Sequence, residues 1–173
     1  MALRVGLGGV CLMATFQFKG LDAYIKQLSA LNAGDTGDII GKTVYAGAAV
    51  VADAVRKSIE ALPVGPGTAK EGELIDTVTP TQKRGLLDGF GISRIQNDDG
   101  FVNVKLGFDG YNGTRTKNYP KGQPNVLIAR AVNSGTTFRK KTRFVDKAVS
   151  SSKKAAEKAM DETCNREIEK IMK

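Results

Sequence analysis

Apolar residues recur at three- and four-residue spacing in two segments of the first third of the chain. Leu21, Tyr24, Ile25, Leu28 and Leu31 predict a short amphipathic helix. A longer stripe predicts a second helix, which begins at about Asp35 or Asp38 and ends at Leu62, where Pro63 stops it; its members are Ile40, Val44, Ala48, Val51, Val55, Ile59 and Leu62. The middle of this second helix is rich in alanine, so we expect another element to approach it closely.

A two-residue alternation replaces this pattern in the middle of the chain. Val102, Val104, Leu106 and Phe108 fall on one face of an expected strand, and the sequence at 97–100, Asn-Asp-Asp-Gly, is typical of a hairpin turn. A glycine-rich apolar segment, residues 85–92, leads into the other arm of this hairpin. Asp98 and Asp99 raise the alternative of an acid/base pair or a Mg²⁺ site, but turns favour Asp for backbone reasons, and we interpret them as turn residues.

The last third of the chain returns to helical spacing. Pro124 starts a helix of about ten residues that ends at Ser134-Gly135, and a long helix begins at about Arg143 and continues towards the C-terminus. We therefore predict an α+β fold with two N-terminal helices, a small antiparallel hairpin sheet, a short helix, and a long C-terminal helix packed on the sheet. Residues 16–173 are expected to form a single domain, and residues 1–15 a flexible N-terminal extension that is too short to span a membrane.

Basic residues concentrate between Tyr111 and Val145. This stretch contains eight Lys or Arg residues and no Asp or Glu, and it accounts for the whole formal charge of +8. An exposed basic loop is expected at 109–123, where Tyr111 and Tyr119 lie among the cations. Such a loop is suited to a nucleic acid, to an acidic neighbouring subunit, or simply to solvent. The candidate partner-binding residues are Arg115, Lys117, Lys121, Arg139, Lys140, Lys141 and Arg143.

The composition argues against most catalytic chemistry. The chain contains no histidine, which excludes Ser-His, Cys-His and His-metal sites. Cys11 and Cys164 match no zinc, redox or nucleophile motif, and we interpret them as unpaired, partly buried thiols. No cofactor or metal is expected, and we predict that the protein is not an enzyme.

Four features resemble the minor tail-component or neck (head-tail joining) protein family of long-tailed bacteriophages. Phe18-Lys19-Gly20-Leu21-Asp22 precedes a short helix, a long Ala/Val helix ends in Leu62-Pro63, and Gly85-Leu86-Leu87 leads into a hairpin. The fourth is the segment 128–137, Ile-Ala-Arg-Ala-Val-Asn-Ser-Gly-Thr-Thr, which is followed by an aromatic residue and a long helix. The resemblance covers roughly residues 16 to 172. Asn133 stands where that family usually has Glu, and Thr142-Arg143-Phe144-Val145 replaces a Pro-Phe entry to the last helix.

The resemblance implies a non-catalytic virion structural protein that acts in neck or tail assembly at the head-tail junction. Its implied partners are further copies of itself, in a homo-oligomer or ring, and neighbouring head-completion or tail proteins. Its implied location is the virion, and the host cytoplasm during assembly, with no membrane association. The alternative drawn from the charge pattern is a nucleic-acid-binding module that uses residues 111–145 for non-specific contact with DNA.

Overall fold

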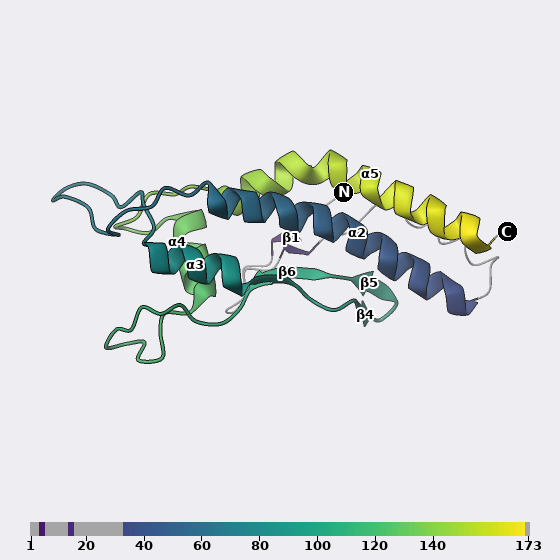
Figure 1. Ribbon diagram of the computed structural model, residues 1–173, viewed down its shortest axis with the longest axis horizontal. Helices are drawn as coiled ribbons and strands as arrows, with labels where there is room; N and C mark the ends of the chain where they lie inside the picture. The colour runs from purple at the N-terminus through teal and green to yellow at the C-terminus, as the bar shows by residue number, and fades with distance from the viewer. Residues whose placement is uncertain (1–3, 6–13, 16–32, 172–173) are drawn as a thin grey trace.

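A pair of long helices is the largest structural unit of the molecule. The computed structural model describes residues 4–5, 14–15 and 33–171. Helices α2 (Ala33–Glu60) and α5 (Phe144–Ile171) lie antiparallel along each other over most of their length (Figure 1). The alanine-rich stripe of α2 makes this close approach feasible, as the sequence predicts: a Cβ atom added to Gly47 would lie 2.6 Å from the sulfur of Met160.

Beneath α2 lies a small antiparallel sheet. Strands β3 (Phe90–Ile92) and β6 (Lys105–Phe108) pair with each other, and β4 (Gln96–Asp98) pairs with β5 (Phe101–Asn103) as a second, two-stranded sheet. The predicted hairpin is therefore confirmed. Asp99 and Gly100 both have positive φ, and Gly100 N donates to Asn97 Oδ1 at 2.9 Å, which makes the predicted turn a tight two-residue turn.

The core lies where α2, the sheet and two shorter helices meet. Helix α4 (Asn125–Ser134) begins after Pro124 and ends before Gly135, as predicted. Helix α3 (Pro80–Gly89) was not predicted, although its signal is present in the sequence: Thr79 and Gln82 form a capping box around Pro80. The most deeply buried side chains belong to α2, to α3 and the segment before it, and to α4; they are Val51, Val55, Ile59, Val78, Leu86 and Val132. The sheet contributes the buried side chains of Phe90, Leu106 and Phe108.

The position of the C-terminal helix differs from the prediction. Helix α5 was expected to pack on the sheet, but it packs along α2, and α2 lies between α5 and the strands (Figure 1). Phe144, in the first turn of α5, reaches the sheet through an edge contact with Phe108, their ring centroids 6.3 Å apart. The reason is that α2 carries buried residues on two sides, so it fills the layer that the prediction assigned to α5.

The N-terminal region contributes two short strands. Within residues 1–15, for which a flexible extension is expected, β1 (Arg4–Val5) pairs with β2 (Ala14–Thr15), and β2 pairs with β6. The strand order of the larger sheet is thus β1-β2-β6-β3. The short helix predicted from Leu21 to Leu31 lies outside the described residues. None of the helices in the described part of the chain is both long and apolar enough to cross a membrane.

Candidate functional site

The basic loop, residues 109–123, has an anchored base. Asn112 and Asn125 are buried there: Asn125 Nδ2 donates to the carbonyl oxygen of Asp109 at 2.8 Å, and Asn112 Oδ1 accepts from Thr114 N at 2.8 Å. The backbone N–H groups of Asn112 and Gln123 donate to the carbonyls of Gln123 and Thr114, respectively. Because these bonds close the two ends of the loop on each other, its outer part projects from a fixed base.

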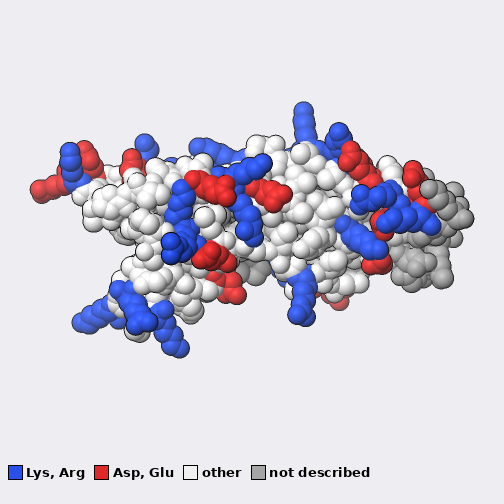
Figure 2. Space-filling view, in the orientation of Figure 1, with Lys and Arg blue, Asp and Glu red and all other residues white. Residues whose placement is uncertain are grey.

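The outer part of the loop is a second, smaller hairpin that carries the cations. Thr116 and Tyr119 exchange two backbone hydrogen bonds of 3.1 and 3.0 Å, which places Lys117 and Asn118 at the tip. Arg115, Lys117 and Lys121 are exposed, and none has an acidic partner within ion-pair distance among the described residues. The group of blue side chains without red ones at the lower left of Figure 2 lies where Figure 1 places this loop.

The second part of the basic stretch lies on the connection between α4 and α5, and here the candidate residues separate. Arg139 is buried, and its Nη1 donates to the carbonyl oxygen of Thr77 at 2.6 Å. Burial also lowers the pKa of its guanidinium. Arg139 is therefore a structural residue and not a surface cation, contrary to its selection as a partner-binding residue. Lys140, Lys141 and Arg143 are exposed.

Hydrogen bonds fix the turn that contains Arg139. Thr136 and Arg139 exchange backbone bonds of 3.0 and 3.2 Å, Ile75 N donates to Phe138 O at 2.9 Å, and Lys140 N donates to Ile75 O at 2.8 Å. We call residues 136–140, together with 74–77, the braced turn. It joins two segments that are more than sixty residues apart, and no local sequence pattern predicts that they pair.

Asn133 caps the last helix. It is buried, and its Oδ1 accepts from Val145 N at 3.0 Å, in the first turn of α5. Thr142 N and Thr142 Oγ1 both donate to Val132 O, and Arg143 N donates to Asn133 O. Asn133 Nδ2 also donates to the carboxylate of Asp146 at 3.4 Å, so this amide acts as both donor and acceptor at the junction of α4 and α5.

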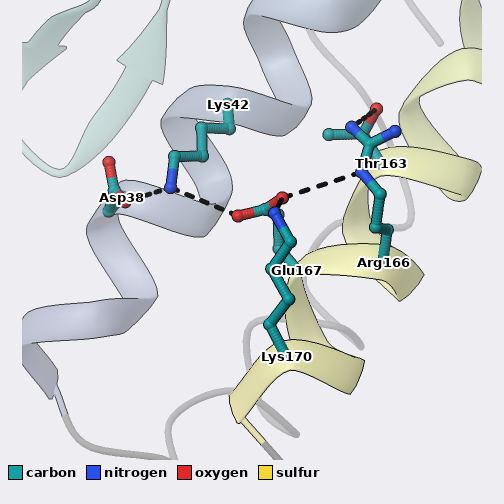
Figure 3. A network of polar contacts seen from close by, with 6 residues as sticks. All are labelled: Asp38, Lys42, Thr163, Arg166, Glu167 and Lys170. Carbon is teal, nitrogen blue, oxygen red and sulfur yellow. Dashed lines mark hydrogen bonds and ion pairs between the residues drawn. The ribbon is translucent and has the colours of Figure 1, made fainter.

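A charged network that was not predicted from the sequence lies at the other end of the helix pair. The Glu167 side chain is only 8% exposed and accepts a hydrogen bond from Lys42 Nζ at 3.2 Å; Lys170 also donates to it (Figure 3). Lys42 in turn lies 2.6 Å from Asp38. Hydrogen bonds from Lys170 and Lys42 lower the pKa of Glu167, and those to Asp38 and Glu167 raise the pKa of Lys42.

A hollow of about 420 Å³ adjoins this network. Its walls come from α2, α5 and the segment before β4, and consist of Lys42, Tyr45, Ala46, Ile95, Thr163, Arg166 and Glu167. Tyr45 and Ile95 are 43% and 47% exposed, which is high for large apolar side chains. Glu167 could have been recognised from the sequence, because it continues the spacing of the buried stripe that contains Met160 and Cys164.

The structure thus divides the predicted site. Arg115, Lys117 and Lys121 lie together on the basic loop, whereas Lys140, Lys141 and Arg143 lie beyond α4, a helix of ten residues. Asp99 lies in the turn, as interpreted, and Asp98 is the last residue of β4, where it accepts from Asn103 Nδ2 at 2.9 Å. Cys164 is a buried free thiol, and Cys11 lies outside the described residues. Within the part of the chain that the structure describes, no three His, Cys, Asp or Glu side chains are grouped to hold a metal ion.

Comparison of the chain with models of protein families, with curated proteins and with solved structures finds no match.

Proposed function

We propose that the protein is a non-catalytic virion structural protein that acts in neck or tail assembly of a long-tailed bacteriophage, through contacts with neighbouring subunits. The sequence resemblance to the neck and tail-component family is the reason for proposing a bacteriophage particle. The observation that best supports a binding role is the basic loop, in which three exposed cations project from a base fixed by Asn112 and Asn125 and have no acidic partner among the described residues.

The construction of the loop favours recognition over a passive role as a solvated connection. A loop that serves only to connect β6 to α4 does not require buried amides and a second hairpin at its tip. Fixing the backbone beforehand lowers the entropy lost on binding, and cations without internal partners lose no ion pair when they meet an acidic surface. The expected partner is therefore an acidic surface on a head-completion or tail protein.

The test is complementation of a phage that lacks the gene. The wild-type protein should restore head-tail joining, and a variant with Arg115→Glu, Lys117→Glu and Lys121→Glu should not. The matched control is Lys147→Glu, Lys153→Glu and Lys154→Glu, which changes the charge equally on an exposed part of α5 and should restore joining. Fully joined, infectious particles in the absence of the protein would contradict the proposal.

A second candidate function, non-specific binding of nucleic acid, is favoured by one observation: Tyr111 and Tyr119 are 61% and 38% exposed beside the same cations. Exposed aromatic rings next to Lys and Arg suit stacking on bases and contact with phosphates. This function predicts retention on DNA that weakens steeply with salt, because binding releases counterions. Unchanged retention of the triple loop variant would contradict it.

A further inference from the structure

The base of the basic loop carries a strip of apolar side chains on its outer side. Tyr111 and Pro124 form an antiparallel bridge, and residues directly opposite each other in such a pair have their side chains on the same side. The residues that follow them, Asn112 and Asn125, are buried, so the alternation of side chains turns the bridged pair outward. Leu127, one turn further along α4 and 38% exposed, continues this surface. We call Tyr111, Pro124 and Leu127 the apolar strip.

Hydrogen bonds fix the backbone under the apolar strip. Asn112 N donates to Gln123 O at 2.9 Å, and Leu127 N donates to Pro124 O at 3.1 Å. An aromatic side chain on a fixed backbone has only two torsion angles left to restrict, so covering Tyr111 with a partner loses little conformational entropy. Side chains of this kind often contribute most of the binding energy of an interface.

Cations outnumber acids around the apolar strip. Arg130 is exposed one turn of α4 beyond Leu127, and the three cations of the basic loop lie on the segment that joins the other two members of the strip. Asp88 and Asp109 are the exposed acids at the foot of the loop, and neither forms an ion pair with a described residue. Four cations against two acids leave a positive surround, which favours the approach of an acidic partner.

The aliphatic members of the strip favour a protein partner over a nucleic acid. A nucleic acid offers phosphates to the cations and bases that stack on Tyr111, but no group that requires Leu127. A protein segment that covers Leu127 with an apolar side chain removes both from water, which stabilises the complex. Such an apolar centre inside a charged rim is the usual arrangement of a protein–protein interface.

From these observations we propose that the apolar strip receives an apolar side chain of an acidic protein segment, whose carboxylates pair with the surrounding cations. The segment that fits is rich in Asp and Glu and carries isolated large apolar residues. The inference rests on the proposed function, because it takes the basic loop to bind an acidic protein. It adds that the strip selects the partner, since cations alone do not discriminate between one acidic surface and another.

The test uses two short synthetic peptides as probes. Both consist mainly of glutamate, and one carries leucine at the positions where the other carries serine. Fluorescence anisotropy should show that the wild type binds the leucine peptide about tenfold more tightly, as expected for burial of one leucine side chain. Leu127→Gln and Tyr111→Gln should each lose this preference while keeping the wild-type circular dichroism spectrum. Leu74→Gln, the matched control, changes an exposed leucine outside the strip and should keep it.

Three results would overturn the inference: the wild type binds neither peptide, it binds both equally, or its preference survives in both Leu127→Gln and Tyr111→Gln. A single-stranded oligothymidylate supplies the nucleic-acid arm. If it binds more tightly than the leucine peptide, and its binding depends on Tyr111 but not on Leu127, the inference falls in favour of nucleic acid.

Complementation of the phage separates the inference from the proposed function. The expected peptide binding together with fully joined particles in the absence of the protein would contradict only the proposed function. Restored joining by the wild type together with equal binding of the two peptides would contradict only the inference.

Discussion

Substitution of Arg139 tests whether this residue of the basic stretch 111–145 stabilises the fold or is available to bind a partner. Replacing Arg139 with Ala removes the 2.6 Å hydrogen bond to Thr77 O and leaves that carbonyl without this donor. Hydrogen bonds to charged groups contribute about 1.5–3 kcal/mol, and removal of the desolvated guanidinium offsets a small part of the loss. We expect the free energy of unfolding to fall by about 2 kcal/mol.

Urea denaturation followed by circular dichroism measures this change. With a slope of about 2 kcal/mol/M, the midpoint should fall by roughly 1 M. Lys140→Ala is the matched control: Lys140 is the next residue, it is exposed, and its loss should change the free energy of unfolding by no more than about 0.5 kcal/mol. Arg139→Met keeps most of the aliphatic stem and isolates the contribution of the hydrogen bond.

Unfolding of Arg139→Ala and Lys140→Ala at the same urea concentration would contradict this expectation. That result would mean that the bond to Thr77 contributes nothing and that Arg139 is available to a partner after all. A large loss in Arg139→Ala but none in Arg139→Met would assign the effect to packing of the stem.

Three further predictions concern other parts of the fold. Because the folded-state pKa of Glu167 is lowered, its contribution to stability is present above the unfolded-state pKa and is lost as the pH falls through the folded-state value. Melting temperatures measured from pH 7 downward should therefore fall less steeply in Glu167→Gln than in the wild type. Equal slopes in the two proteins would contradict this prediction. Gly122 has φ +111°, and a Cβ atom added to it would lie 2.0 Å from Asn112 O, whereas Gly72 has φ +82° and a Cβ atom added to it would have no atom within 4 Å. Gly72→Ala should therefore lower the free energy of unfolding by about 1 kcal/mol, and chemical denaturation should show a clearly larger decrease for Gly122→Ala. Thr79→Ala breaks the capping box of α3 and should cost about 1 kcal/mol in the same assay, and an unchanged midpoint would mean that the cap is dispensable.

Local patterns predicted most of the helices and the hairpin because their causes lie close together in the sequence. The stripe of α2, the turn at Asp99-Gly100 and the limits of α4 at Pro124 and Gly135 depend on spacing and on backbone preferences. Helix α3 was missed because only ten residues separate its cap from the next strand, and its glycines and leucines resembled the entry to a hairpin.

Contacts between distant segments could not be predicted in the same way. Nothing near Arg139 in the sequence indicates Thr77, so Arg139 was grouped with the exposed cations. The helical spacing could have indicated that Glu167 is buried, but nothing near it in the sequence indicates Lys42 as its partner. The predicted packing of α5 on the sheet was wrong for a similar reason, because the apolar stripe of α5 shows that one face is buried but not which element covers it. The basic loop, by contrast, was located by composition alone, since an acid-free run of polar residues has no apolar face to bury.

We propose that the exposed cations of the basic loop bind an acidic surface of a neighbouring virion protein. This proposal is tested most directly by native mass measurement of the purified protein mixed with a candidate head-completion or tail protein. We predict a complex with the wild type and with the α5 charge-reversal control, and its loss when Arg115, Lys117 and Lys121 are replaced by Glu. A complex of equal stability with the triple loop variant would contradict the claim.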